Sequence, residues 1–431
     1  MRVHAPERSE HTVFVRCARR IVPLFAVIVL LNYIDRANIG FAALTMNRDL
    51  GFTPSQYGLG AGVFFLGYGV LQVPVSVLIH RIGVRRGLFC IMVAWGLFSS
   101  TCAFMHSPIS FYVLRFLLGV AEAGFFPAIM VCLTSWFPQN HRARYTAMFQ
   151  SAAQLAFVIG GPLSGLLLGL DGVGGFRGWQ WLFLVEGVPT LIWAVVVLCA
   201  LPDRPSDAGW LSDSDRQLMA TAHARDATVT RHGVRSALFD PRIYILGAAL
   251  FCVSIGDYGL IFWWPQMVQA MGFSDLTSSL IVAVAYLASI PAAILLARSS
   301  DARGERRCHI ASAALFSAAG LLVASIAPFY QLQLVALAAA TMGTLAARPP
   351  MNNLPTVFLG GAGAAAGIAL YNAIGNFGGF AGPYMIGLLK EYTGGYQTAM
   401  AALAVFPVIS AAIILIIGRR LQDRPPLAAP S

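Results

Sequence analysis

The sequence has few charged residues. Asp, Glu, Lys and Arg make up 11% of its 431 residues, whereas about 25% is usual in soluble domains. Hydrophobic residues make up 57%, so a soluble globule would lack the polar side chains needed to cover its surface. The apolar runs are long and continuous rather than alternating, which excludes a transmembrane β-barrel. The composition therefore predicts an all-α membrane protein.

Lysine is almost absent as well, since Lys390 is the one Lys among 29 basic residues. A net charge of +10 would suit a nucleic-acid partner, but the positions of the charges argue against one. Six basic residues lie inside predicted spans or in outer loops: Arg36, Arg48, Arg115, Arg177, Arg348 and Lys390. The others all lie on one side of the predicted membrane, which by the positive-inside rule is the cytoplasmic side.

Motifs of enzymes and pumps are missing. Seven Cys are scattered, mostly inside apolar runs, with no CxxC pair and no Cys/His cluster, which argues against disulfides and a metal site. There is no GxxxxGKS/T, no HExxH and no nucleophile elbow, so the sequence favours neither an ATP-driven pump nor an enzyme. We expect no cofactor, with the proton as the coupling ion.

Twelve apolar segments are long enough to cross a bilayer, which takes about 20 mostly apolar residues. They cover residues 21–44, 55–79, 88–106, 109–136, 144–170, 180–201, 243–271, 277–298, 308–327, 331–358, 362–389 and 397–418. Arg-rich loops follow spans 2, 4 and 8, so both termini are predicted to be cytoplasmic. The first span is too long for a signal-peptide core, and we expect it to stay uncleaved in the inner membrane.

One polar segment divides the spans six and six. The predicted parts are a cytoplasmic tail at 1–20, a six-helix bundle at 21–201, a cytoplasmic linker at 202–242, a second six-helix bundle at 243–418 and a tail at 419–431. Within the linker, Ser212 to Arg225 is typical of an amphipathic helix lying at the membrane face.

The two halves carry a weak internal repeat. His80–Arg86 lies 221 residues before Asp301–Arg307, and the same offset carries Gly161-Pro162 onto Gly382-Pro383. Duplicated six-helix halves around a central site are the plan of secondary transporters.

The first span contains an Asp and an Arg. Asp35 and Arg36 follow Asn32 within an apolar run, where each charge costs about 2.5–3.5 kcal/mol on insertion scales. Such residues face the bundle interior and mark functional sites by default. We expect Arg36, whose planar fork suits carboxylates, to hold an anionic substrate and Asp35 to titrate. The alternative is an ion pair that only ties helices together.

Span 4 places Arg115, Gly119 and Glu122 at i, i+4 and i+7, hence on one helix face. Burial raises the pKa of a carboxylic acid and a nearby guanidinium lowers it. A change in the distance between Arg115 and Glu122 would therefore bind and release a proton, whereas a permanent salt bridge is the alternative. We group Asp35, Glu122 and Arg115 as the predicted proton-coupling residues.

Polar side chains in spans 2, 5 and 11 are candidate substrate ligands. Tyr68 and Gln72 are one turn apart in span 2, and a stripe of small and polar residues runs along span 11. The other candidates are Gln150 and Gln154 in span 5, and Asn372 and Asn376 in span 11. These groups would hydrogen-bond a small solute, or equally bridge helices as polar residues in membranes do.

The second half also contains intramembrane charges. Asp257 in span 7 is a candidate second proton site. Arg348 precedes Pro349-Pro350 in span 10, and a broken helix is tolerated only near a cavity or protein partners. Arg348 is either a second anion-binding residue or a side chain that snorkels to the interface. Glu186 lies nearer the outer end of span 6 and is interpreted as structural.

Several motifs run through nearly the whole chain in order. They are Asn32-Tyr33-Ile34-Asp35-Arg36-Ala37-Asn38-Ile39-Gly40, Arg115 to Pro127, Trp136-Phe137-Pro138, Gly178 to Phe183 with Glu186-Gly187, Leu201 to Pro205, Phe262 to Gln266, Ala365 to Leu370 and Gly375 to Gly379. On these motifs the chain resembles the major facilitator superfamily. Within it the chain is similar to the anion:cation symporter family, especially the bacterial tartrate/phthalate-type organic-acid transporters.

The resemblance implies a major facilitator fold of two six-helix pseudo-repeats and proton-coupled symport of a small carboxylate by alternating access. Asp35 and Glu122 match the titrating carboxylates of the family's sugar-acid symporters. The family's substrate-contacting positions are matched or adjoined by Arg36, Tyr68, Gln154 and Asn376, with Gln150 and Asn372 one turn away.

The loop after span 2 departs from the family's pattern, because His80 stands where an Asp normally pairs across the cytoplasmic gate. The second copy of the loop keeps Asp301. The predicted gating residues are Arg81, Arg85, Asp301 and Arg303.

The sequence thus predicts a monomeric secondary transporter, surrounded by lipid, whose substrate is a small organic anion. An exchanger or facilitator without proton coupling is one alternative. A non-transporting membrane sensor is another, although it would need a signalling domain and the short tails show none.

Overall fold

The computed structural model describes residues 4–226, 238–355, 359 and 361–422. Helices are the one kind of regular secondary structure in these residues, which confirms the all-α class. The long helices are α1 (His4–Leu50), α2 (Pro54–Ile82), α3 (Val84–Thr101), α4 (Pro108–Glu122), α5 (Phe125–Trp136), α6 (Gln139–Leu168), α7 (Gly178–Ala200), α8 (Asp213–Asp226), α10 (Pro241–Gln269), α11 (Asp275–Arg303), α12 (Arg307–Ile326), α13 (Tyr330–Asn352), α14 (Gly361–Asn376), α15 (Gly378–Thr393) and α16 (Gln397–Gln422).

Eight helical stretches in the described residues are long and apolar enough to cross a membrane. They are Val84–Phe104, Pro108–Trp136, Gly178–Ala200, Pro241–Gln269, Asp275–Arg303, Arg307–Ile326, Tyr330–Asn352 and Gln397–Ile416, and each coincides with a predicted span. The other four predicted spans fall on α1, α2, α6 and the pair α14–α15. The total of twelve crossings therefore stays a prediction.

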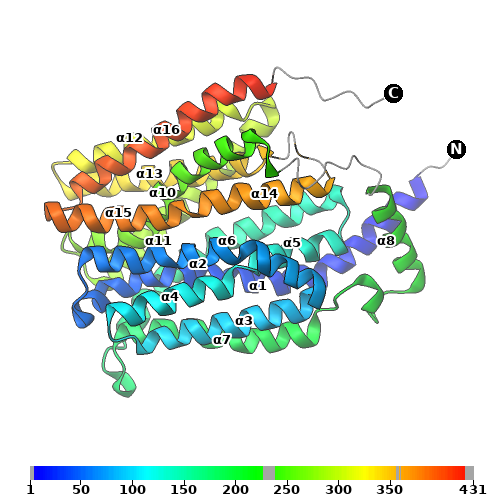
Figure 1. Ribbon diagram of the computed structural model, residues 1–431, viewed down its shortest axis with the longest axis horizontal. Helices are drawn as coiled ribbons and strands as arrows, with labels where there is room; N and C mark the ends of the chain where they lie inside the picture. Colours follow the sequence, from blue (N-terminus) through cyan, green and yellow to red (C-terminus); the bar gives the residue numbers. More distant parts are fainter. Residues whose placement is uncertain (1–3, 227–237, 356–358, 360, 423–431) are drawn as a thin grey trace.

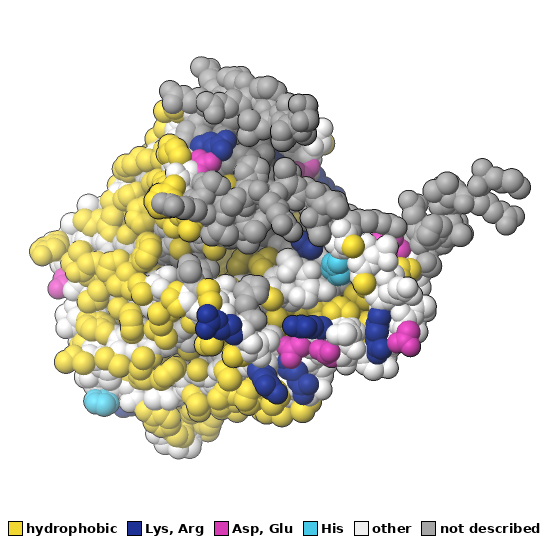
Figure 2. Space-filling model, turned by 45° about the vertical axis from the view of Figure 1, so that its right-hand side comes forward, with side chains coloured by type: hydrophobic (Ala, Val, Ile, Leu, Met, Phe, Trp, Pro, Cys, Tyr) yellow, Lys and Arg dark blue, Asp and Glu magenta, His cyan; other side chains and the backbone are white. Residues whose placement is uncertain are grey.

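Large hydrophobic side chains cover the sides of the bundle (Figure 2). Ile109, Leu166 and Ile326, for example, are more than half exposed. Arg and Lys side chains gather instead near the end of the molecule where α8 lies (Figure 2). An apolar belt with charges gathered at one end is the surface expected of a membrane protein.

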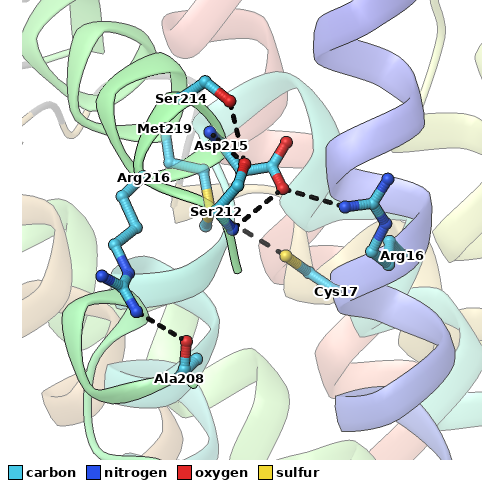
Figure 3. Close-up of polar contacts among 8 residues, drawn as sticks. All are labelled: Arg16, Cys17, Ala208, Ser212, Ser214, Asp215, Arg216 and Met219. Atoms are coloured by element: carbon cyan, nitrogen blue, oxygen red, sulfur yellow. Dashed lines mark hydrogen bonds and ion pairs between the residues drawn. The ribbon is translucent and has the colours of Figure 1, made fainter. Parts of the chain in front are cut away.

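The predicted tail at 1–20 is helical from His4, because α1 continues through it without a break. This extension gives the linker helix α8 a surface to pack on (Figure 3). Arg16 Nη1 lies 2.9 Å from Asp215 Oδ2, Cys17 Sγ lies 3.9 Å from Met219 Sδ, and Met219 is buried. The predicted linker helix is present, and one face of it packs on α1. The exact boundaries of the predicted domains stay predictions, because residues 227–237 lie outside the described residues.

Two predicted spans are interrupted. Span 4 consists of α4 and α5, which separate at Ala123-Gly124. Pro127 causes the interruption, since it has no N–H to bond the carbonyl of Ala123 one turn earlier. Span 11 likewise consists of α14 and α15, which separate at Phe377, and Pro383 lies in the second turn of α15.

The helices run roughly parallel in two groups, with α1–α7 in one half of the molecule and α10–α16 in the other (Figure 1). Between the halves, α2 packs on α15, α6 packs on α11 and α1 packs on α10. The predicted repeat relates the first span to the seventh, the second to the eighth and the fifth to the eleventh. Applied to these contacts, the repeat converts the α2–α15 contact into the α11–α6 contact and leaves the α1–α10 contact unchanged. This is the packing expected of two pseudo-equivalent halves.

We call the end of the bundle opposite the termini the distal end (Figure 1). Hydrogen bonds join the two halves at this end. The pairs are Tyr57 Oη to Phe262 O at 2.8 Å, Asn47 Nδ2 to Gln266 Oε1 at 3.1 Å, Gln269 Nε2 to Leu44 O at 3.1 Å and Ser55 N to Glu391 Oε2 at 2.8 Å. The distal end is thus closed in this structure.

Glycines allow this close approach. A Cβ on Gly161 of α6 would lie 2.7 Å from the backbone oxygen of Ser279 on α11, and a Cβ on Gly58 would lie 2.5 Å from Pro383 O. Neighbouring Gly160, by contrast, has one atom within 4 Å of such a Cβ, at 3.9 Å. Gly161 is therefore a contact point between the halves, whereas Gly160 is not.

The pair of glycines provides a matched test of distal closure. We expect Gly161→Val to lower the thermal unfolding temperature of the detergent-purified protein, because overpacking a close contact costs about 1–3 kcal/mol. Gly160→Ala should leave that temperature unchanged or raise it, since Ala favours a helix by about 1 kcal/mol over Gly. Equal unfolding temperatures for the two variants would contradict close packing of α6 on α11.

Candidate functional site

An ion pair joins α1 to α4 inside the first half. Arg36 Nη2 lies 2.7 Å from Glu122 Oε2, and Asn32 Nδ2 donates to the same oxygen at 2.8 Å. Asn32 and Arg36 are four residues apart, so both reach one carboxylate from the same face of α1. All three side chains are buried. The other oxygen, Glu122 Oε1, has no hydrogen-bond partner among the described residues.

Backbone contact between α4 and α2 puts Glu122 in this position. A Cβ on Gly119 would lie 2.0 Å from Phe64 O, so only Gly allows the two helices to approach this closely. Glu122 is the last residue of α4, one turn after Gly119. The carboxylate therefore projects into the space between α1 and α2.

Asp35 does not pair with its neighbour Arg36. Its Oδ2 accepts a hydrogen bond from Trp95 Nε1 at 2.8 Å, and its Oδ1 accepts one from Asn38 Nδ2 at 3.1 Å and another from Ser99 Oγ. These donors tie Asp35 to α3. Trp95 and Ser99 were missed from the sequence, although a buried Ser one turn from a Trp in an apolar span is a usable signal.

Arg115 is fully buried and has no ion-pair or hydrogen-bond partner for any of its three guanidinium nitrogens among the described residues. Its Cζ lies 5.0 Å from the centre of the Phe64 ring, and it interacts electrostatically with Asp35 and Glu122 at longer range. The predicted pair between Arg115 and Glu122 is not formed. Seven residues along one helix separate the two by about 10 Å, whereas Arg36 approaches Glu122 from the side.

Aromatic rings surround the Arg36 guanidinium. Its Cζ lies 5.5 Å from the centre of the Tyr33 ring, 5.2 Å from that of Phe64 and 5.2 Å from that of Tyr68. Contacts of this length are favourable cation–π interactions. The structure thus places Tyr68 beside Arg36.

The structure describes the side chains of three of the four predicted amide ligands. Gln154, Asn372 and Asn376 are half-buried, and their side chains form no hydrogen bond with other described residues, so their amides are available to a ligand. Asn376 ends α14 at the interruption of span 11. The side chain of Gln150 lies outside the described residues.

In the second half, Asp257 of α10 and Arg348 of α13 form an ion pair at 2.6 Å. The Arg348 guanidinium therefore faces α10, whose residues 252–268 are all buried. Glu186 of α7 is also buried, and neither of its carboxylate oxygens has a hydrogen-bond partner in the described part of the chain.

The predicted gating residues lie away from this site, near the end that carries the termini. Arg81, Asp301 and Arg303 are exposed. Arg85 is held within its own half, where its backbone N–H donates to Asp203 Oδ1 at 2.8 Å and its Nε donates to Leu198 O. None of the four pairs with the opposite half among the described residues. The side chain of His80 lies outside the described residues.

Comparison with known proteins decides the family. Residues 25–383 and 246–431 match the profile of the Major Facilitator Superfamily. The chain belongs to the major facilitator superfamily. A protein of Agrobacterium vitis named "Putative tartrate transporter" is 44% identical over 403 residues, which cover 93% of this chain and 90% of that protein. The "Quinolone resistance transporter" of Acinetobacter baumannii is 37% identical over 408 residues, which cover 94% of each chain.

A solved structure shows the same fold. It is a bacterial homologue of the human lysosomal transporter Spinster in an inward-facing, occupied conformation, and it matches with a TM-score of 0.76 at 17% identity, covering 95% of this chain and 98% of that one. By its family and its relatives, this facilitator-superfamily member is a membrane-embedded transporter and not an enzyme.

The buried pair in this transporter makes a prediction about stability. We expect Glu122→Ala to destabilise the protein by about 3–5 kcal/mol, because it leaves the Arg36 charge buried without its partner. The double variant Arg36→Met with Glu122→Leu should recover most of this loss, since replacing both charges with apolar side chains is often neutral. The measurement is reversible unfolding in mixed detergent micelles. A double variant less stable than Glu122→Ala would contradict direct pairing.

Proposed function

We propose that this transporter couples proton entry to the uptake of a small organic acid, with Arg36 as the substrate-binding cation and Glu122 as the proton-binding group. The observation that supports this is the ion pair itself. Arg36 is held by a carboxylate, and a substrate carboxylate is the chemical equivalent of that partner. Substrate and Glu122 therefore compete for one guanidinium.

A proton resolves the competition. When Glu122 is ionised, Arg36 is neutralised and an incoming anion meets a negative charge beside it. When Glu122 takes up a proton, Arg36 becomes an uncompensated buried cation, which strongly favours a new anionic partner. Binding of one proton and one substrate carboxylate adds charges of +1 and −1, so the net charge of the site stays unchanged. Coupling follows from this charge balance.

The candidate substrate ligands suit a hydroxylated carboxylic acid. Tyr33 and Tyr68 lie against the guanidinium, and the amides of Gln154, Asn372 and Asn376 are free of other described partners. Hydroxyl and amide groups of this kind hydrogen-bond sugar acids and hydroxy acids. The name of the Agrobacterium vitis relative makes tartrate the first compound to test.

The transport cycle is rocking of residues 21–201 against residues 243–418 around the central site. The Arg-rich loops put both termini in the cytoplasm of a cell whose inner membrane carries the protein. In that orientation the closed distal end faces outward. Arg81, Arg85, Asp301 and Arg303 are then the residues that meet when the opposite end closes.

The test of coupling is Glu122→Gln in proteoliposomes. Gln keeps an oxygen for Asn32 and Arg36 but does not titrate, so the variant should exchange labelled tartrate against internal tartrate while failing to accumulate it under an inward proton gradient. We expect accumulation to fall at least about tenfold, the change that corresponds to 1.4 kcal/mol. Accumulation equal to wild type would contradict the proton role of Glu122.

Two controls complete this experiment. Arg36→Ala should lose both exchange and accumulation, because the substrate loses its cation. Arg48→Ala, at an exposed position outside the site, should keep both. A wild-type protein that exchanges substrate but ignores the proton gradient would instead be an exchanger or facilitator.

A further inference from the structure

Besides Asp35 and Glu122, one more carboxylic acid is buried in the first half, and the proposed mechanism does not use it. Glu186 lies on α7 and its side chain is buried, yet neither of its carboxylate oxygens has a hydrogen-bond partner among the described residues. An ionised carboxylate away from water is costly unless it is paired or hydrogen-bonded. The charge state of Glu186 therefore needs an explanation.

Two of the helices that pack on α7 have no charge to offer Glu186. Helices α1, α3 and α6 and the short helix η1 (Cys102–Phe104) pack on α7. Residues 91–101 of α3 and 146–168 of α6, which form most of their apolar lengths, contain no charged or titratable side chain. A charged neighbour of Glu186 on these elements must therefore come from α1 or η1.

The charged group that acts on Glu186 is another carboxylic acid. Asp35 of α1 interacts with Glu186 electrostatically, whereas Arg36 is held by Glu122 and Cys102 of η1 is a buried thiol. When two carboxyl groups share a buried site, one of them keeps its proton. Asp35 is the ionised member, because it accepts three hydrogen bonds and Glu186 accepts none from the described residues.

The count of buried charges agrees with a neutral Glu186. The other charged side chains buried in the described part of the first half are two carboxylates and two guanidiniums, namely Asp35, Glu122, Arg36 and Arg115. Their formal charges sum to zero. An ionised Glu186 would leave one negative charge in the interior without a cation to compensate it.

Asn38 connects Glu186 to Asp35. Asn38 interacts with both carboxyl groups, and its Nδ2 donates to Asp35 Oδ1 at 3.1 Å. Its own oxygen, Oδ1, is buried without a partner among the described residues. An amide oxygen and the oxygens of an ionised carboxylate are all acceptors. A proton on Glu186 turns one of these acceptors into a donor for Asn38 Oδ1.

We propose that Glu186 keeps a proton throughout the transport cycle and acts as a positioning residue, whose carboxylic acid holds Asn38 in the orientation that donates to Asp35. This proposal rests on the proposed function and on the prediction that Asp35 titrates. Glu122 gains and loses a proton in each cycle, whereas Glu186 does not. Through Asn38, Glu186 sets how readily Asp35 releases its proton, since the donated hydrogen bond favours the ionised form of Asp35.

Infrared spectroscopy of the purified full-length protein tests the proton directly, because the C=O stretching band of a protonated carboxylic acid is separate from the bands of carboxylates and amides. At neutral pH we expect Glu186→Gln to lose intensity in this band relative to wild type. Asp213→Asn, at a side chain that is 98% exposed, should leave the band unchanged. If Glu186→Gln also leaves it unchanged, Glu186 is ionised and the proposal is overturned.

The pH dependence of tartrate accumulation in proteoliposomes tests the positioning role. Glu186→Gln is neutral and keeps a donor for Asn38, so it should accumulate tartrate with the pH dependence of wild type, in contrast to Glu122→Gln. Glu186→Leu cannot hold Asn38. It should move the pH dependence about one unit toward higher pH, since a hydrogen bond to a charged group is worth about a tenfold change in an equilibrium constant.

A double-mutant cycle tests whether Glu186 acts through Asn38. Asn38→Ala should give the same shift as Glu186→Leu, and the double variant should show no further shift, because both changes remove one donated hydrogen bond. Additive shifts would show that the two residues act separately. Thermal unfolding of each variant checks that it is folded, and the comparison of Glu186→Gln with wild type decides the question if Glu186→Leu does not fold.

The other results overturn the proposal in distinguishable ways. Loss of accumulation by Glu186→Gln would show that Glu186 releases its proton during the cycle. An unshifted pH dependence in Glu186→Leu would show that Glu186 does not position Asp35. In both cases the role of Glu122 would stand. Failure of wild type to take up any carboxylate would reject the proposed function, and a loss of the infrared band in Glu186→Gln would then make Glu186 a structural acid.

Discussion

The ion pair between Arg36 and Glu122 is the interaction on which the site depends. Its side chains are 7% and 0% exposed, and removing two charges from water costs several kcal/mol per ion, which their attraction repays only in good geometry. Packed apolar side chains would stabilise the fold at least as well. The presence of the pair is therefore better explained by what happens when one of its members loses its charge. When either member is neutralised, the other remains as an uncompensated buried charge that favours binding of an opposite charge. The proposed carrier of protons and anions needs this response.

The fold holds this pair inside the first half. Gly119 brings α4 against the backbone of α2, and the interruption after Glu122 ends α4 at the carboxylate. Across the interface, Asp257 and Arg348 form a comparable pair between α10 and α13. Because α2 packs on α15 and α6 on α11, movement of one half against the other changes the surroundings of both pairs together. The two-part architecture and the paired charges thus suit the proposed mechanism.

Hydropathy and charge placement were enough to predict the all-α class, the order of the spans and the linker helix. They were not enough to predict the interruption in span 4, because Gly and Pro in a membrane helix are often accommodated without a break. The candidate residues were found because a buried charge is rare in a span. The partners of these residues were not found, because helical spacing identifies neighbours within one helix and gives no information about contacts with another helix. Glu122 was accordingly paired with Arg115, whereas the structure pairs it with Arg36, and the donors Trp95 and Ser99 of α3 were not assigned to Asp35.

The central claim is that substrate reaches Arg36 only when Glu122 carries a proton. The most direct measurement is the number of protons taken up on substrate binding, obtained by calorimetric titration of tartrate, or whichever carboxylate binds, in two buffers of different ionisation enthalpy. The account predicts net proton uptake by wild type when the pH is high enough that Glu122 is ionised before substrate binds. In Glu122→Gln, position 122 should contribute no proton uptake. Substrate binding without proton uptake by wild type across the titrated pH range would contradict the account.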